Sequence, residues 1–393
     1  MFTVLFVTWD GGGNVPPALG IAAELKRRGN AVRFLGHPSQ KAAIDVAGFE
    51  FEAYRHAKPW SVLAARSAMT APFAYAAVFT DTGMGEDLVE SVQRTATDRV
   101  VIDGLLVGAM AGAARAGIPY SVLVHTLYGV MFPTLTTGPL SVIARVKRIN
   151  PGPLYASADR ILAATLEELD VGSHAGVDYT GVDFTGPVVP RNLRENPAAA
   201  SIGRKSASAP LVLVSLSTTA IAGQREALQR IIDALGGLPV RAVVTTGPAI
   251  DPAELRAPAN AEMRRSVPHE QLMRQASLVI SHGGHATAML ALAHDLPLLI
   301  IPMNLSFDQP VIGQVIAERN AGLALGKKAT VGEVRAAVER MLADPSSNPY
   351  RQAAVRLGAL VRSQNGAEVA AGLIAAERPC PARRGGAVRG VSG

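Results

Sequence analysis

The first half of the chain alternates short apolar runs with segments of helical periodicity. Runs rich in β-branched residues predict strands, and apolar positions spaced three and four apart predict helices. The expected strands are Phe2–Trp9, Val32–Leu35, Val100–Ile102 and Tyr120–Val124, and the expected helices are Pro17–Arg28, Lys41–Ala47 and Val107–Ala116. Strands that alternate with helices pair in parallel, because the chain crosses back over the sheet between them. We therefore expect a doubly wound parallel sheet.

The same alternation starts again after residues 195–210, where Asn, Ala, Ser, Lys and Pro occur without periodicity, as is typical of a linker. The elements expected beyond it are the strands Leu211–Leu216, Arg241–Thr245, Leu278–Ser281 and Leu296–Ile301 and the helices Arg225–Leu235 and His285–His294. The sequence thus predicts two Rossmann-like domains, at residues 1–194 and 211–348. Ligands of such sheets bind where the strands end, so we expect the chemistry in the cleft between the domains.

Composition agrees with this picture. A chain of 393 residues exceeds the size at which one hydrophobic core stops growing. The apolar stretches are interrupted before the roughly 18 residues that a membrane span needs, so stable membrane insertion is not expected. The first strand follows Met1 without an export signal, and the single cysteine, Cys380, has no partner for a disulfide within the chain. Both features favour a cytoplasmic location.

The net charge of +6 is concentrated at the C-terminal end. Residues 378–393 carry four arginines among Pro, Gly and Ala, a composition that predicts a disordered tail. Without these arginines the net charge is about +2, which is too small to indicate a nucleic-acid partner.

A glycine-rich turn follows a buried strand of the second half. Ser281–Thr287 reads SHGGHAT and leads into a helix. The two glycines allow a phosphate to approach the backbone N–H groups of the helix N-terminus. The expected phosphate-binding residues are His282, Gly283, Gly284, Ala286 and Thr287. Such a turn can stabilise a departing diphosphate without a metal ion. The alternatives are a strand-to-helix turn with no ligand, and a metal pair of His282 and His285 that lacks further ligands.

The next strand also ends in polar residues. Its loop leads to Asp308 and Gln309 at the start of a helix, and a carboxylate beside an amide suits adjacent sugar hydroxyls. Taken alone, an aspartate at this position is more often a helix cap. Because successive strands of one sheet both end in ligand-competent loops, we expect the two loops to face the same cleft.

In this order and spacing, the motifs resemble those of the GT-B-fold glycosyltransferases, a family that includes the UDP-glucuronosyltransferases and the actinomycete antibiotic glycosyltransferases. Val267-Pro268-His269 is similar to the loop that holds the nucleotide base, and Ser217-Thr218 lies in a segment similar to the family's first C-domain phosphate loop. The turn and the Asp308-Gln309 pair match its diphosphate and sugar sites. The resemblance covers nearly the whole chain.

The resemblance implies an α/β, GT-B fold, with two Rossmann-like domains facing an inter-domain cleft. The N-terminal domain would bind the acceptor and the C-terminal domain the nucleotide sugar. A final helix within 349–377 would pack back on the N-terminal domain. The nucleotide sugar is then a co-substrate, and neither a resident cofactor nor a metal site is expected.

The sequence departs from the family at the residue that should activate the acceptor. The family's Gly-His-Val-x-Pro reads Gly13-Asn14-Val15-Pro16-Pro17 here, and an amide cannot take up a proton at neutral pH. The candidates for the missing base are Asp10, Asp103 and His125, all near strand ends, and Asp103 resembles the aspartate that orients the family's histidine. We hypothesise that one of the three activates the acceptor while Asn14 holds it. An acidic acceptor would need no base at all.

A second departure concerns the donor. Family members that use UDP-sugars commonly place a glutamate for the ribose hydroxyls three positions after the threonine of the turn, where this chain has Leu290. A buried 2′-hydroxyl without a partner costs about 1–3 kcal/mol, whereas a 2′-deoxyribose avoids that cost. The sequence therefore favours dTDP over UDP.

The expected activity is an inverting transfer of a sugar, expected to be a deoxysugar, to a hydrophobic natural product. Apolar stretches at Trp60–Ala77 and Val124–Leu135 are candidates for the acceptor pocket. The alternatives are a catalytically silent nucleotide-sugar-binding partner, which Asn14 favours, and a nucleotide-sugar epimerase. A dehydrogenase is disfavoured, because Gly11-x-Gly13 is followed by proline and the second strand ends without a carboxylate. The sequence leaves the acceptor, the sugar and the oligomeric state open, a homodimer included.

Overall fold

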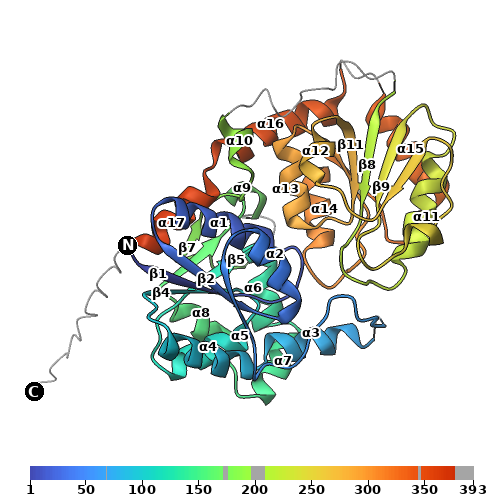
Figure 1. Ribbon diagram of the computed structural model, residues 1–393. Helices are drawn as coiled ribbons and strands as arrows, with labels where there is room; N and C mark the ends of the chain where they lie inside the picture. The colour runs from blue at the N-terminus through green and yellow to red at the C-terminus, as the bar shows by residue number, and fades with distance from the viewer. Residues whose placement is uncertain (68, 171–175, 196–208, 344–346, 377–393) are drawn as a thin grey trace, which may run out of the picture.

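The computed structural model describes residues 1–67, 69–170, 176–195, 209–343 and 347–376. These residues form two α/β domains, each built on a parallel sheet (Figure 1). Most of the predicted linker and the whole of the predicted tail, with Cys380, lie outside the described residues.

The first sheet has the strand order β3-β2-β1-β4-β5-β6-β7. Its strands are β1 (Thr3–Val7), β2 (Ala31–Gly36), β3 (Glu50–Ala53), β4 (Arg99–Asp103), β5 (Ser121–Val124), β6 (Arg160–Ala163) and β7 (Val182–Phe184). The helices and turns between them are α1 (Val15–Arg27), η1 (Pro38–Gln40), α2 (Lys41–Val46), α3 (Ala71–Phe79), α4 (Gly83–Arg94), α5 (Val107–Arg115), α6 (Tyr128–Thr136), α7 (Pro139–Val146), α8 (Pro151–Ala156) and α9 (Glu167–Asp170), followed after β7 by α10 (Arg191–Glu195).

The second sheet repeats the plan in the order β10-β9-β8-β11-β12-β13. Its strands are β8 (Leu211–Ser215), β9 (Arg241–Thr245), β10 (Ala261–Arg264), β11 (Ala276–Ser281), β12 (Leu298–Ile300) and β13 (Gly322–Ala324). Its helices and turns are α11 (Gln224–Leu235), η3 (Pro252–Glu254), α12 (His269–Met273), α13 (His285–Ala293), α14 (Gln309–Glu318) and α15 (Val331–Leu342), and two further helices end the described chain, α16 (Pro349–Ser363) and α17 (Gly366–Ala375).

Both sheets bury apolar side chains on both faces, because helices cover each side. Along β1, Leu5 and Val7 pack on one face while Val4 and Phe6 pack on the other. This period of two, with every position apolar, is what a parallel strand covered on both faces requires. No helix of the described residues has the length and apolar character that a membrane crossing requires.

The order of strands turns back at β1 and β4 in the first sheet and at β8 and β11 in the second. Ligands of doubly wound sheets bind at such switch points, beyond the carboxyl ends of the strands. In both domains the loops after these strands are directed toward the other domain (Figure 1).

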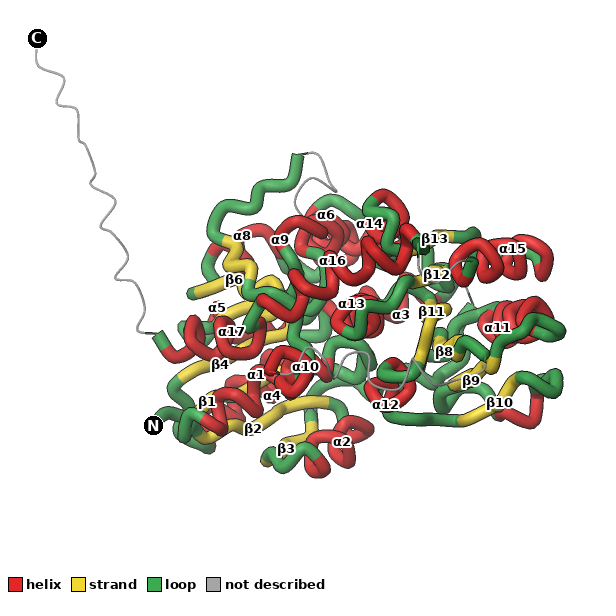
Figure 2. Tube along the Cα trace, turned by 90° about the horizontal axis from the view of Figure 1, so that it is seen from above, coloured by secondary structure: helices red, strands yellow, loops and turns green. Residues whose placement is uncertain are grey.

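The end of the described chain crosses from the second domain to the first. α16 packs against α13 through Ala353 and Ala354, whereas α17 packs against α1 through Ala370 and Ala371. Seen from above, α16 lies beside α13 and α17 beside α1 (Figure 2). The segment expected to form a single final helix is thus two helices, one on each domain.

Candidate functional site

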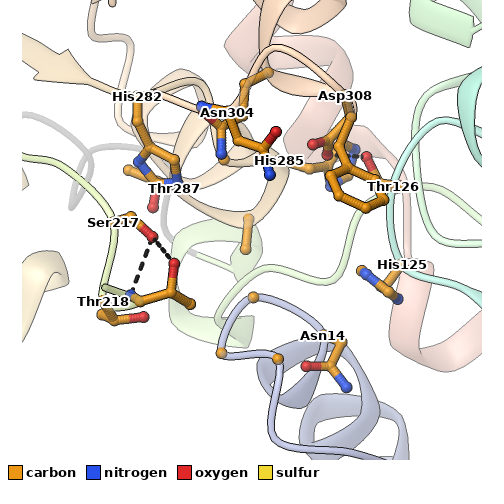
Figure 3. A pocket seen from close by; sticks show the side chains of 18 of the residues that line it. Asn14, His125, Thr126, Ser217, Thr218, His282, His285, Thr287, Asn304 and Asp308 are labelled. Atoms are coloured by element: carbon orange, nitrogen blue, oxygen red, sulfur yellow. Dashed lines mark hydrogen bonds between the residues drawn. The ribbon is translucent and has the colours of Figure 1, made fainter. Parts of the chain in front are cut away.

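A cavity of roughly 320 Å³ lies between the two domains, where the strand ends face each other. Its lining includes eleven of the residues that the sequence predicted, namely Asn14, His125, Ser217, Thr218, His269, His282, Gly284, Ala286, Thr287, Asp308 and Gln309. Figure 3 shows side chains of both domains around this cavity, among them Asn14 and His125 of the first and His282, Thr287 and Asp308 of the second. Five predicted residues do not line it, namely Asp10, Asp103, Val267, Pro268 and Gly283.

The glycine-rich turn joins β11 to α13 at the edge of this cavity. Gly283 has a φ of +85°, a left-handed conformation that glycine adopts without strain. Gly284 precedes the first turn of α13, and no side chain caps this helix end. The leading N–H groups of a helix have no partner within it, so those at Ala286 and Thr287 are available to an anion in the cavity.

His282 lines the same end of the cavity as a neutral imidazole. Burial lowers its pKa to about 4, and the neighbouring His269 acts in the same direction, although a backbone contact at Ser215 opposes them. Its Nδ1 has no hydrogen-bond partner among the described residues. A neutral imidazole can still donate one hydrogen bond to a phosphate oxygen.

Asp308 links the domains instead of capping its helix. Its carboxylate makes no capping hydrogen bond to α14, but its Oδ2 accepts one from the Thr126 hydroxyl at 2.5 Å. Burial raises its pKa, while Thr126 and the nearby His125 act against that rise. The carboxylate also lines the cavity, where a ligand can reach it.

Gln309 has fewer free hydrogen-bonding groups for a ligand than its position in the sequence suggested. Its Oε1 accepts the backbone N–H groups of Met303 at 2.9 Å and Asn304 at 2.8 Å. These bonds shape the loop after β12, and they leave only the amide nitrogen for a ligand. The pair therefore presents one carboxylate acceptor and one amide donor, and not two acceptor groups.

The other two predicted nucleotide loops contribute unequally. The Ser217 hydroxyl lies 2.7 Å from that of Thr219 and accepts the Thr219 N–H at 3.1 Å, which holds the loop after β8 in a tight turn. His269, the first residue of α12, lines the cavity, but Val267 and Pro268 in the loop before this helix do not.

On the acceptor side, Asp103 lies between Asn14 and His125. Asn14 donates from Nδ2 to the Asp103 Oδ2 at 3.0 Å, and the His125 Nδ1 lies 3.2 Å from the same oxygen. Burial lowers the pKa of His125, but the charges of Asp103 and Asp308 outweigh it, so the pKa is raised. Asp103 is buried behind the cavity wall.

Asp10, the other candidate base, is turned away from the cavity. Its carboxylate accepts a hydrogen bond from the Ser39 hydroxyl at 2.8 Å, and its backbone oxygen accepts one from the Trp60 indole. Its expected role in activating an acceptor does not fit this position, because neither Asp10 nor its partner Ser39 lines the cavity.

The wall opposite the phosphate turn is apolar. Trp9, Tyr75, Phe79 and Phe307 line the cavity, and Phe307, from the second domain, makes edge contacts with Tyr75 and Phe79 at centroid distances of 5.6 and 6.3 Å. Val130 and Met131 of α6 add to this wall. Of the predicted stretch Trp60–Ala77, only Tyr75 lines the cavity.

The two histidines of the turn do not form a metal pair. The His285 Nε2 lies 2.9 Å from the Thr165 hydroxyl of the first domain, and burial lowers the pKa of His285 to about 3. Within the described part of the chain, no cluster of three or more His, Cys, Asp or Glu side chains could hold a metal ion.

Sequence reasoning assigned no individual role to several lining residues, chiefly Thr126, Thr219, Asn304 and Phe307, although Thr126 lies within the stretch Val124–Leu135 predicted for the acceptor pocket. Thr126 and Thr219 each follow a strand next to a residue that was recognised, so their position at a strand end was the available signal. The loop conformation that brings Asn304 and Phe307 inward depends on Gln309, which no local pattern reveals.

Comparison with protein families places residues 229–376 in the domain described as "Erythromycin biosynthesis protein CIII-like, C-terminal domain". Among characterised relatives, 4'-demethylrebeccamycin synthase of Lentzea aerocolonigenes is 25% identical over an alignment of 407 positions. The alignment spans 90% of this chain and 94% of that protein. Demethyllactenocin mycarosyltransferase of Streptomyces fradiae is 31% identical over 49% of this chain and 40% of its own length.

Solved structures share the architecture. A glycosyltransferase of kitacinnamycin superposes with a TM-score of 0.75 at 23% identity, over 96% of this chain and 99% of that one. The glycosyltransferase VinC, solved in complex with dTDP, superposes with a TM-score of 0.68 at 20% identity, over 95% of this chain and 98% of that one. The two-domain arrangement predicted from the sequence is confirmed by this likeness.

Proposed function

We propose that this chain, a glycosyltransferase of GT-B fold with an EryCIII-like C-terminal domain, transfers a deoxysugar from a dTDP-sugar to a hydrophobic small molecule with inversion at the anomeric carbon. The observation that carries this proposal is the cavity itself. Its lining combines helix N–H groups and a carboxylate with an apolar wall.

The donor would lie on the second domain. Its diphosphate would accept hydrogen bonds from the N–H groups of Ala286 and Thr287, and from the side chains of His282 and Thr287. The sugar hydroxyls would bind the Asp308 carboxylate and the Gln309 amide nitrogen. As the bond from the anomeric carbon to the diphosphate breaks, these preoriented donors stabilise the charge that develops on the leaving group. The transfer needs no metal ion, since the turn supplies the positive potential.

The preference for dTDP rests on Leu290. This side chain packs against the core of the second domain, on the third position after Thr287. It offers no acceptor to a ribose 2′-hydroxyl. Relatives of the same fold include one solved with dTDP, which agrees with this preference. We expect dTDP to bind more tightly than UDP by about 1–3 kcal/mol, as titration calorimetry of the two nucleotides would measure.

The acceptor would lie against the aromatic wall. Rings at Trp9, Tyr75, Phe79 and Phe307 provide faces and edges for a flat, apolar aglycone. Phe307 adjoins Asp308 in sequence, so the residue that completes this wall belongs to the loop that would hold the sugar. Donor and acceptor would thus be aligned by one segment, which reduces the entropy cost of bringing them together.

Incubation with dTDP- and UDP-sugars and a panel of hydrophobic aglycones, followed by mass spectrometry, tests the proposal. We expect a product heavier by one deoxysugar, with a yield that a metal chelator leaves unchanged. Asp308→Asn should reduce kcat/KM by about 100-fold, while the exposed Asp45→Asn should match the parent. Binding of dTDP without transfer to any aglycone would instead support a silent partner protein, and a change of the sugar within the donor would support an epimerase.

A further inference from the structure

The family places a catalytic base at the start of α1, and this chain lacks it. The structure reduces the number of residues that could take its place. Asn14 lines the cavity, but its amide nitrogen donates to the Thr8 hydroxyl, the Trp9 backbone oxygen and Asp103. Asp103 lies behind the wall and Asp10 points outward. Among these candidates, His125 alone is a basic group that reaches the cavity.

His125 follows β5 and sits between the Thr126–Asp308 pair and Asn14 (Figure 3). Its Nδ1 is buried and lies 3.2 Å from the Asp103 Oδ2, a contact at ion-pair distance whose alignment falls short of a hydrogen bond. Its Nε2 is not among the enclosed atoms, and it makes no hydrogen bond within the described residues. A carboxylate beside Nδ1 favours the tautomer with the proton on that nitrogen, which leaves the lone pair of Nε2 directed at the cavity.

Asn14 helps to hold this arrangement. Its amide donates to the Oδ2 that faces His125, and the Asp103 Oδ1 accepts the backbone N–H of Leu105 at 3.0 Å. Hydrogen bonds to both oxygens fix the orientation of this carboxylate. Asn14 therefore supports the aspartate from the position at which the family's histidine would stand.

We propose that His125 is the general base of this enzyme, with Asp103 and Asn14 as positioning residues. The inference rests on the proposed transfer. The Nε2 lone pair takes the proton from an O–H or N–H of the acceptor, and the acceptor atom forms a bond to the anomeric carbon. The bond from that carbon to the diphosphate breaks, and its electron pair leaves with the diphosphate. Asp103 then stabilises the imidazolium.

The groups that face His125 determine its response to pH. Asp103 at the end of β4 and Asp308 before α14 are carboxylates, and His285 on α13 is an imidazole whose pKa is held low. The two carboxylates raise the pKa of His125 above its ordinary value of 6.5. Because the base acts when unprotonated, kcat/KM should rise with pH through that raised pKa. In Asp103→Asn the pKa falls, so the rise should move to lower pH.

The decisive experiment compares His125→Ala and His125→Gln with the parent, using an acceptor that the parent glycosylates. We expect kcat to fall by about 100-fold or more, with the affinity for dTDP unchanged. Added imidazole should restore part of the activity of His125→Ala. The His125 variants should lose less of the parent's rate with an acidic phenol as acceptor than with an alcohol, because a phenol releases its proton more readily. His56→Gln, on the exposed surface, is the matched control.

The possible results distinguish the assignment of His125 as the base from the proposed sugar transfer. If the parent transfers sugar and both His125 variants keep its rate within about threefold, the assignment of the base is wrong. An Asp103→Asn profile that rises at the same pH as that of the parent would also contradict it. If the parent binds dTDP but glycosylates no acceptor, the proposed function fails, whatever the His125 variants do. Retained dTDP binding by the variants shows that they fold.

Discussion

Four histidines line the cavity, namely His125, His269, His282 and His285, and each has different surroundings. Burial lowers the pKa values of the three on the second domain, where no carboxylate outweighs it. His125 is as deeply placed, but it faces two carboxylates, so its pKa moves the other way. Residue type alone therefore predicts neither charge nor role, because the partners come from other elements.

His285 should make the stability of the protein depend on pH. Its pKa is about 3 in the folded chain, against about 6.5 when exposed in the unfolded chain. Below pH ~6.5 the unfolded state binds more protons, so the free energy of unfolding should fall as the pH drops from ~6.5 toward 3. Between pH ~7 and ~5 this residue should account for at most about 2 kcal/mol.

Urea unfolding at these two pH values measures the effect. The variant His285→Asn should show a smaller difference between them than the parent. An undiminished difference in the His285 variant would mean that folding does not lower the pKa of His285.

At the scale of elements, the turn between β11 and α13 depends on one glycine. A Cβ at Gly283 would lie 2.8 Å from the backbone oxygen of Gln309 and 2.9 Å from the Ile300 Cγ2, in a left-handed conformation. We expect Gly283→Ala to destabilise the fold by about 1–3 kcal/mol and to weaken dTDP binding by at least tenfold. Thermal unfolding and calorimetry measure both, with Gly326→Ala as control, since its Cβ meets no neighbouring atom. Parent-like dTDP affinity in Gly283→Ala would show that the turn does not hold the nucleotide.

The elements that the sequence predicted well are the long or fully buried ones. The apolar runs of β1 and β8 and the amphipathic pattern of α1 identified both sheets and their order of connection. Short edge strands such as β7 and β13, of three residues each, went unrecognised. They form because a neighbouring strand offers hydrogen-bonding groups, and that information is absent from the local pattern.

The site too could be predicted only where its features are local in the sequence. The turn at Ser281–Thr287 could be predicted because glycine spacing and position after a strand are local properties. The bonds of Thr126 to Asp308 and of His285 to Thr165 join residues 182 and 120 positions apart, across the two domains. Neither residue of the first domain stood out in the sequence, since a lone threonine after a strand has many ordinary explanations.

At the scale of the whole molecule, the contacts between domains surround the cavity. Thr126 with Asp308, Thr165 with His285, and Tyr75 with Phe307 each pair a residue of one domain with one of the other. α17 ties the second half of the chain to α1 on the far side. The reacting groups are therefore positioned by the docking of two domains, and neither domain alone holds a complete site.

A crystal structure with dTDP and a glycosylated acceptor bound together would test this account most directly. The measurement that matters is the position of the acceptor atom that carries the sugar. We predict that it lies within hydrogen-bonding distance, about 3 Å, of the His125 Nε2, with the diphosphate on the N–H groups of Ala286 and Thr287. An acceptor atom bound at Asn14 and remote from His125, or a diphosphate held elsewhere, would contradict the account.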